Sequence, residues 1–368
     1  MPTAPALVDL ENLRHDVDEA VERHLADLTT EVRAVGEPAK VLAAQVGTLL
    51  SGGKRLRAAF CYWSFRAHGG AADGPERTAA VRAGAALELF QAAALLHDDV
   101  MDASDTRRGL PTAHRAFEAR HRDAGWAGDP GRFGESAAIL LGDLCLVACQ
   151  REMAAAVADL PAGTARAARE LFDAMQTEVV VGQYLDVLVQ AEPWGQDPAA
   201  DERRAREVIR AKTSRYSVER PLALGAILAG AGPERVATMT TAGIPLGEAF
   251  QLRDDVLGVF GDPDVTGKPA GDDLREGKRT VLAARTMAEA DEQGRELLTA
   301  HLGDPDLDEA TVARLRDVIR SSGALDGVEE LIGTLSAVAF DTLVAAELDD
   351  DPRQVLVGLA HAAVDRAA

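Results

Sequence analysis

The chain has 368 residues and a formal net charge of −21, and 47% of its residues are hydrophobic whereas only 4% are aromatic. This acidity disfavours binding to nucleic acids and to anionic membrane surfaces. The sequence has no run of eighteen apolar residues and no basic, hydrophobic leader, so we expect a cytoplasmic protein without stable membrane insertion.

The composition also indicates the fold class. Ala and Leu dominate, β-branched runs are scarce, and neither βαβ alternation nor a glycine-rich nucleotide loop is present. These features favour an all-α fold of about ten to twelve closely packed helices without a sheet, and we expect one domain over residues 1–368. Three cysteines, an odd number, lie in apolar helical patterns, which indicates buried, reduced thiols: Cys61, Cys145 and Cys149.

Residues 8–50 are predicted to form two helices interrupted by Gly36-Glu37-Pro38. Gly52 and Gly53 then lead into Lys54 and Arg57, which are three residues apart at the start of an apolar helix. Glycines allow a tight turn, and a helix N-terminus attracts anions, so this stretch is a candidate anion site. Taken alone, it is equally typical of a turn followed by a basic helix cap.

The next predicted helix, residues 78–102, contains a long apolar run and ends in acidic residues. Asp98 and Asp102 are four residues apart and share one face, Asp99 flanks them, and Gln91 lies on the same face two turns earlier. Clustered carboxylates repel one another unless a cation offsets their charge, and all-oxygen ligands suit Mg²⁺. The alternative is a solvated acidic helix end.

Basic and polar candidates follow along the chain. Arg107 and Arg108 lie in a predicted loop, 106–112, where guanidinium groups would suit phosphate oxygens. Residues 119–135 are predicted to be a loop or short insertion. Further helices are expected at 136–158, 166–188, 203–216 and 221–231, and the third of these carries three candidates: Lys212, Thr213 and Tyr216.

A second aspartate pair, Asp254-Asp255, lies near the end of a predicted helix at 246–260, one turn after Gln251. The loop 261–277 contains Asp273, and the last ninety residues alternate acidic turns with apolar helices. Of the five lysines in the chain, four lie in the segments described above or in this loop and the helix start after it: Lys54, Lys212, Lys268 and Lys278. Ammonium groups suit phosphate oxygens, although coincidence is the alternative.

In combination, Gly-Gly-Lys-x-x-Arg, the two Asp-Asp pairs and the segment from Gly261 to Lys278 resemble the trans-isoprenyl (all-E polyprenyl) diphosphate synthases, above all the bacterial geranylgeranyl diphosphate synthases. The resemblance extends from Gly52 to about Thr280. It implies an isoprenoid-synthase bundle around a central cavity, usually homodimeric. One departure is plain, because the second pair is usually followed by a third Asp at position 258, where this chain has Gly258.

The resemblance implies condensation of isopentenyl diphosphate with an allylic diphosphate, namely dimethylallyl, geranyl or farnesyl diphosphate. It assigns three Mg²⁺ ions to Asp98, Asp102 and Asp254, and the orientation of waters to Asp99, Asp255 and Asp273. It assigns the allylic diphosphate to Arg107, Lys212 and Lys268, with Lys278 at its rim. It assigns isopentenyl diphosphate to Lys54, Arg57, Arg108 and Gln91, and the reacting centre to Thr213, Tyr216 and Gln251.

The length of the product depends on what lies below Asp98. Ala93 and Ala94 are one helical turn below and small, and Phe90 is two turns below, about 12 Å down the helix. We therefore expect growth beyond C15, to C20 geranylgeranyl diphosphate. Alternatively, the alanines merely pack against a neighbouring helix, and other residues form the floor of the product cavity, which is the barrier that stops chain growth.

Two rival functions remain open at this stage. A class I terpene cyclase shares the fold, but its second metal motif needs an Asn, and Asn12 is the only Asn in the chain. A non-catalytic regulatory subunit of a heteromeric synthase is favoured only by Gly258.

Overall fold

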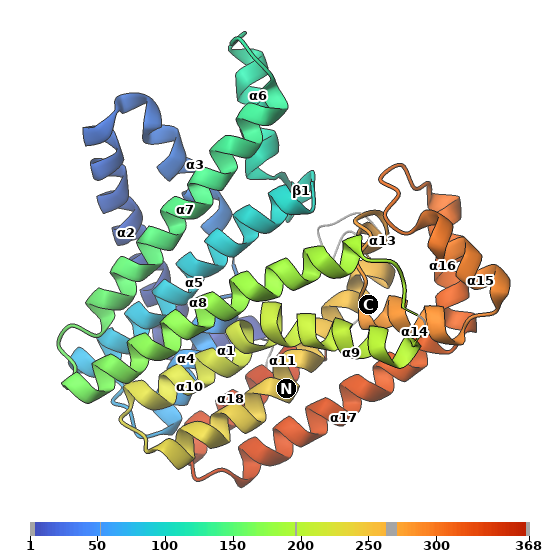
Figure 1. Ribbon diagram of the computed structural model, residues 1–368. Coiled ribbons are helices and arrows are strands. Elements are labelled where there is room, and N and C mark those ends of the chain that lie inside the picture. Colours follow the sequence, from blue (N-terminus) through green and yellow to red (C-terminus); the bar gives the residue numbers. More distant parts are fainter. Residues whose placement is uncertain (1–3, 52, 196, 263–270, 366–368) are drawn as a thin grey trace.

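The computed structural model describes residues 4–51, 53–195, 197–262 and 271–365, and it confirms the all-α prediction (Figure 1). The elements of the N-terminal half are α1 (Ala4–Val8), η1 (Leu10–Asn12), α2 (Leu13–Val35), η2 (Glu37–Ala39), α3 (Lys40–Leu50), α4 (Leu56–Ala67), α5 (Gly74–Met101), β1 (Thr106–Arg107), β2 (Leu110–Pro111), α6 (Ala113–Asp123), α7 (Pro130–Ala156) and α8 (Ala162–Ala191). Those of the C-terminal half are α9 (Pro198–Ile209), η3 (Arg210–Glu219), α10 (Arg220–Leu228), α11 (Pro233–Phe260), α13 (Asp272–Arg275), α14 (Val281–Glu289), α15 (Glu292–His301), α16 (Glu309–Ser321), α17 (Ala324–Ala345) and α18 (Asp350–Val364).

Three local predictions need correction. Short elements such as α1 and α13 bring the number of helices in the described residues above ten to twelve. Residues 106–112 form a two-stranded antiparallel hairpin, because Arg108 and Gly109 both adopt the positive φ angles of a tight hairpin turn. Residues 119–135 are largely helical, since Pro130 starts α7 and the Asp129 side chain caps it by accepting from Arg132 N at 2.9 Å.

The buried apolar side chains form one contiguous core that extends from Leu7 to Val364. Helix α5 runs through it and packs most extensively against α7, with α4 and α2 on other sides. The close approach of α5 to α4 depends on small residues, because a Cβ on Gly84 of α5 would lie 2.9 Å from Ala58 Cβ of α4. The continuity of this core supports the proposal of a single domain.

Two helices, α5 and α7, are long and apolar enough to cross a membrane by length and composition alone, although neither contains a run of eighteen apolar residues. In α5, 78% of the most apolar window is buried inside the protein, which is the pattern of a core helix. In α7 the corresponding share is 39%. Burial in the core therefore does not account for the apolar side chains that α7 leaves exposed.

The π-helix η3 shapes the centre of the molecule. Its wider turns lie close to α8 and α11, and both neighbours meet it with glycine. A Cβ on Gly182 of α8 would lie 2.4 Å from the backbone N of Lys212, and one on Gly247 of α11 would lie 2.4 Å from the carbonyl O of Ser214. Glycine at these two positions lets the segment that carries Lys212 lie directly beside both helices.

Candidate active site

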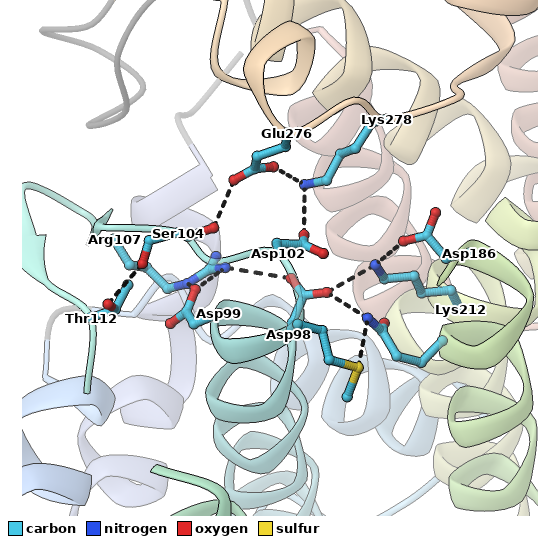
Figure 2. A network of polar contacts seen from close by, with 12 residues as sticks. Asp98, Asp99, Asp102, Ser104, Arg107, Thr112, Asp186, Lys212, Glu276 and Lys278 are labelled. Atoms are coloured by element: carbon cyan, nitrogen blue, oxygen red, sulfur yellow. Dashed lines mark hydrogen bonds and ion pairs between the residues drawn. The ribbon is translucent and has the colours of Figure 1, made fainter. Parts of the chain in front are cut away.

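The first acidic cluster lies at the C-terminal end of α5, as predicted (Figure 2). Asp98 and Asp102 are mostly enclosed, with side chains 16% and 4% exposed, and Asp99 is buried. Cationic groups from three other parts of the chain reach this helix end: Arg107, Lys212 and Lys278. Residues more than 170 positions apart in the sequence therefore meet in one polar network.

Lys212 comes from η3 and lies between two carboxylates (Figure 2). Its Nζ is 2.9 Å from Asp98 Oδ1 and 2.5 Å from Asp186 Oδ2 of α8. Gln183, one turn before Asp186, also donates to Asp98 Oδ1 at 3.0 Å. Burial lowers the pKa of Lys212, but Asp98 and Asp186 outweigh it and raise the pKa, so the ammonium group stays charged.

Arg107 reaches the same helix end from the β1–β2 hairpin. Its guanidinium donates to Asp99 Oδ1, with Nε at 2.7 Å and Nη2 at 2.6 Å, and Nη2 lies 3.5 Å from Asp98 Oδ2. The hairpin is fixed to this end because Thr112 Oγ1 donates to the carbonyl of Ser104 at 2.8 Å. Arg108 follows in the turn with positive φ, and its side chain is directed elsewhere, toward Gly53.

Lys278 links the first acidic cluster to the loop after α13 (Figure 2). Its Nζ lies 3.2 Å from Asp102 Oδ2 and 2.5 Å from Glu276 Oε2. Asp273 Oδ1 lies 3.8 Å from the same Nζ. Ser104, just after α5, donates to Glu276 Oε1 at 2.7 Å. Lys278 was predicted to reach a diphosphate at the rim of the site, and its amino group lies within contact distance of three carboxylates there.

The second acidic pair lies near the end of α11. Asp255 is buried and accepts a hydrogen bond from Gln251 Nε2 at 2.7 Å. Burial, together with the charges of Asp273 and Asp254, raises the pKa of Asp255 to about 8, although the Gln251 hydrogen bond and Lys278 oppose the rise. Lys278 thus acts on Asp98 and Asp102 as well as on Asp255, and this shared ammonium group brings the two acidic clusters into one electrostatic site.

The carboxylates of this site suit a divalent cation. Burial raises the pKa of Asp98, but Lys212, Lys278 and Arg107 outweigh it and hold the pKa below its usual range. Burial raises the pKa of Asp102 to about 6, because Lys278 and Lys212 do not offset desolvation and the nearby Asp98 and Glu276. Asp102 Oδ2 is also buried, and its ion pair with Lys278 Nζ at 3.2 Å lacks the geometry of a hydrogen bond. Hard oxygen ligands with such incompletely offset charge are what Mg²⁺ prefers.

A second basic group lies at the start of α4. Arg57 donates to Tyr216 Oη at 2.6 Å and to Ser217 Oγ at 2.8 Å, and its guanidinium lies 4.3 Å from the Tyr216 ring centroid. Burial lowers the pKa of Arg108, and the positive charges of Arg107, Arg55 and Arg57 lower it further. Lys54 is exposed beside them. Cations that repel one another in this way favour an anion between them.

Below Asp98, α5 is lined by small residues and then by an aromatic cluster. Ala93 is fully buried and Ala94 is half-buried. The Phe90 ring packs edge-on against Tyr216 of η3, at 6.0 Å between centroids, and against Phe172 of α8, at 6.4 Å. The expected floor is therefore shared by three helices rather than built by α5 alone.

The remaining predicted residues are placed as follows. Gln91 and Thr213 are half-buried, on α5 and η3. Asp254 lies beside Asp255 on α11, and Lys268 lies outside the described residues. Two pockets in the described structure lie elsewhere, one against Trp194 and Arg279 and one on α15, so the central cavity stays a prediction.

The sequence reasoning gave no role to three residues of the network, Gln183, Asp186 and Glu276, or to Arg55 before α4. Arg55 fixes the start of α4, because its buried guanidinium donates to Asp18 at 2.7 Å and to Glu88 of α5 at 3.3 Å. Gln183 and Asp186 are three residues apart in an otherwise apolar part of α8, and that spacing was the available signal.

Comparison with known proteins decides the family. The sequence matches the family described as polyprenyl synthetase over residues 39–319. The chain belongs to the polyprenyl synthetase family. Its structure resembles that of a geranylgeranyl pyrophosphate synthase from Corynebacterium glutamicum, solved with isoprenyl diphosphate and magnesium, with a TM-score of 0.89 and 36% identity over 98% of this chain and 100% of that one.

Other polyprenyl synthetases agree in sequence. A geranylfarnesyl diphosphate synthase from Aeropyrum pernix is 33% identical over 79% of this chain and 83% of its own length. A geranylgeranyl diphosphate synthase from Saccharolobus solfataricus is 31% identical over 80% of both chains. The chain is therefore a prenyltransferase of isoprenoid biosynthesis, and the predicted family and class of reaction are confirmed.

Proposed function

We propose that this prenyltransferase joins isopentenyl diphosphate head to tail to an allylic diphosphate (dimethylallyl, geranyl or farnesyl diphosphate) and releases geranylgeranyl diphosphate. The observation that carries the proposal is the pairing of two basic groups around one acidic helix end. Lys212, Lys278 and Arg107 surround Asp98 and Asp102, and Arg57 and Arg108 form the second basic group near the start of α4. Two basic groups suit two diphosphates.

Asp98, Asp102 and Asp254 would hold Mg²⁺, for which we expect three ions. When bound, Mg²⁺ offsets the negative charge that develops on the departing diphosphate. The residues of the chain supply the rest: Lys212, Lys268 and Arg107 bind the allylic diphosphate, and Asp99 and Asp255 orient waters. Such prearranged charges stabilise a leaving group without reorganising during the reaction.

Isopentenyl diphosphate would bind Lys54, Arg57, Arg108 and Gln91, beside the reacting centre lined by Thr213, Tyr216 and Gln251. The allylic C–O bond breaks, the isopentenyl double bond attacks the resulting cation, and a proton leaves the new chain for the released diphosphate. Tyr216 supports this placement because it contacts both Arg57 and Phe90. The apolar residues below it would exclude water from the cation.

A direct assay tests this function. The purified protein is incubated with isopentenyl diphosphate, Mg²⁺ and each allylic primer in turn, and the products are separated by chain length. The proposal predicts diphosphate release with elongation to C20, and loss of both on chelation of Mg²⁺. Hydrocarbon formation without isopentenyl diphosphate would indicate a terpene cyclase, and inactivity until another subunit is added would indicate a regulatory subunit.

The predicted product length rests on the residues below Asp98. Ala93→Phe places a large ring one turn below the carboxylates, so we expect the main product to shorten from C20 to C15. Ala229→Phe is a control for bulk alone, because this half-buried alanine lies at the end of α10. If the Ala93→Phe enzyme still makes the C20 product, residues on this face of α5 do not limit the length of the product. Products are measured by chromatography after dephosphorylation.

We also propose that the chain acts in the cytoplasm as a homodimer. Exposed apolar side chains lie on α7 (Ile139, Leu140 and Val147) and on α8 (Val180, Val181, Tyr184 and Val187). The two helices are neighbours, since Gln150 of α7 donates to Gln176 of α8 at 3.0 Å. A second copy of this surface would cover these side chains, as in an isologous dimer. The three cysteines are buried and free, which suits a reducing compartment.

A further inference from the structure

The acidic C-terminal ends of α5 and α11 differ at one position, which in α11 is Gly258. On α5 the carboxylates of Asp98 and Asp102 are four residues apart and share a face. On α11 the residue four positions after Asp254 is Gly258, which has no side chain. Judged from α11 alone, the second acidic helix end lacks the carboxylate that would complete this pattern.

The space that a side chain at position 258 would occupy is filled by Asp273. A Cβ built on Gly258 would lie 2.0 Å from Asp273 Oδ2, 2.4 Å from its Cγ and 2.9 Å from its Oδ1. These separations are far below van der Waals contact, so the Asp273 carboxylate lies where a 258 side chain would begin. It reaches this place from the first turn of α13, which follows Gly271 with φ of +78°.

The surroundings of the Asp273 carboxylate are those of the active site. Lys278 Nζ lies 3.8 Å from Asp273 Oδ1 and 3.2 Å from Asp102 Oδ2, so one ammonium group lies beside carboxylates of both α5 and α13. The Asp273 charge also acts on the buried Asp255 of α11. The side chain of Asp273 is 12% exposed, comparable to Asp98 at 16%.

We propose that Gly258 and Asp273 are a complementary pair, in which Asp273 supplies from α13 the carboxylate that α11 lacks four residues after Asp254. The pair completes the cation-binding face of α11, and glycine is required at position 258 because a side chain there would displace Asp273. This inference rests on the proposed function insofar as Asp254 faces the divalent cation. It also explains why Gly258 need not weaken cation binding.

Cation binding is tested on the full-length protein with Mn²⁺ as a spectroscopic substitute for Mg²⁺ and inorganic diphosphate present. Asp273→Asn keeps the shape and removes the charge, and we expect it to weaken Mn²⁺ binding about tenfold or more. Asp272→Asn makes the same chemical change one residue away and is expected to change binding less than about twofold. Equal effects of the two variants would overturn the inference.

Moving the carboxylate between helices is the sharper test. Gly258→Asp alone should lower the Tm and should not tighten Mn²⁺ binding, because its side chain collides with Asp273. In the double variant Gly258→Asp/Asp273→Ala, both the Tm and Mn²⁺ binding should recover toward the wild type, to within about threefold in affinity. A double variant that binds no better than Asp273→Ala, or a Gly258→Asp variant that binds more tightly at unchanged Tm, would contradict the pairing.

The elongation assay separates this inference from the proposed function. A wild type that elongates while Asp273→Asn binds Mn²⁺ as the wild type does overturns the pairing and leaves the function intact. A wild type that neither elongates nor binds Mn²⁺ overturns the proposed function and the role of Asp273 in cation binding. In that case the Tm of the Gly258 variants still shows whether the two residues share one space.

Discussion

At the scale of single residues, the charges of the site are matched across distant parts of the chain. Lys212 lies between Asp98 and Asp186, and Lys278 lies between Asp102 and Glu276. Binding of a diphosphate with Mg²⁺ would offer each lysine phosphate oxygens and each aspartate a cation. On the proposed function, we therefore expect an exchange of partners on binding, in which each buried charge keeps a counter-charge.

A residue away from the active site gives a test of electrostatics in folding. Glu152 of α7 accepts from Arg82 of α5 at 2.7 and 3.2 Å and lies 3.4 Å from His24 of α2. Burial raises the pKa of Glu152, but the hydrogen bonds of His24 and Arg82 outweigh it and hold the pKa below 4.5. A carboxyl whose pKa is lowered by folding stabilises the fold above its unfolded pKa and loses this effect at lower pH.

We therefore predict that Glu152→Gln destabilises the protein by about 1–3 kcal/mol near neutral pH. The difference from the wild type should shrink as the pH falls below about 4.5 and through the lower folded pKa. Chemical denaturation at several pH values measures it. Glu170→Gln, in an exposed pair with Arg166 at 4.0 Å, is the control and should have little effect at any pH. A difference that grows toward acid would contradict the prediction.

The site residues differed in how well they were predicted. Asp98, Asp99 and Asp102 were predictable because their spacing places them on one helix end, and Lys212 and Lys278 because lysine is rare in this chain. Gln183, Asp186 and Glu276 were given no role, because each is a common surface residue and gains its partner only from the tertiary fold. Arg55 was missed because its left-handed backbone and buried contacts leave no mark in the local sequence.

At the scale of elements, the contact between α8 and η3 positions Lys212. Gly182→Ala would add a Cβ that lies 2.4 to 2.7 Å from backbone atoms of Ala211 and Lys212, which no side-chain rotation can relieve. We expect a loss of about 1–3 kcal/mol in stability and, because Lys212 is displaced, a fall in elongation rate of about tenfold or more.

Gly163→Ala on the same helix is the matched control for this prediction. Nothing lies within 4 Å of a Cβ at this position, so the variant should be as stable as the wild type or up to about 1 kcal/mol more stable. Thermal denaturation and initial elongation rates measure both variants. If Gly182→Ala behaved like Gly163→Ala, the close packing of α8 on η3 would not hold.

The helices themselves were largely predictable, and the exceptions have physical causes. Apolar periodicity located α5 and α7, and Gly36 and Pro38 marked the break after α2. The stretch 119–135 was misjudged because its Gly, Asp and Arg content outweighed the helix-start signal of Asp129 and Pro130. The π-helical form of η3 was not predictable, since it depends on neighbours that present glycine.

At the scale of the whole molecule, one surface remains apolar. Leu140 of α7 is 61% exposed, and Val180 and Tyr184 of α8 are 63% and 64% exposed. If a second copy covers this surface, Val180→Glu should convert the dimer to a monomer, because a buried carboxylate without a partner is costly. Light scattering coupled to size-exclusion chromatography measures the mass.

Val344→Glu is the control for this prediction, because this valine on α17 is exposed to a similar extent, 58%, on a different helix. It should leave the mass unchanged. A wild-type protein that is monomeric at micromolar concentration would contradict the proposed dimer, as would a dimer that both variants leave intact.

The central claim is that two acidic helix ends, far apart in sequence, form one site for metal and diphosphate. The most direct measurement is anomalous scattering from Mn²⁺ in crystals grown with inorganic diphosphate. We predict peaks at coordination distance, about 2.0–2.6 Å, from oxygens of Asp98 and Asp102 on one side and of Asp254 on the other, with diphosphate between them. Peaks at other residues, or Asp98 and Asp254 facing separate regions of the molecule, would contradict the account.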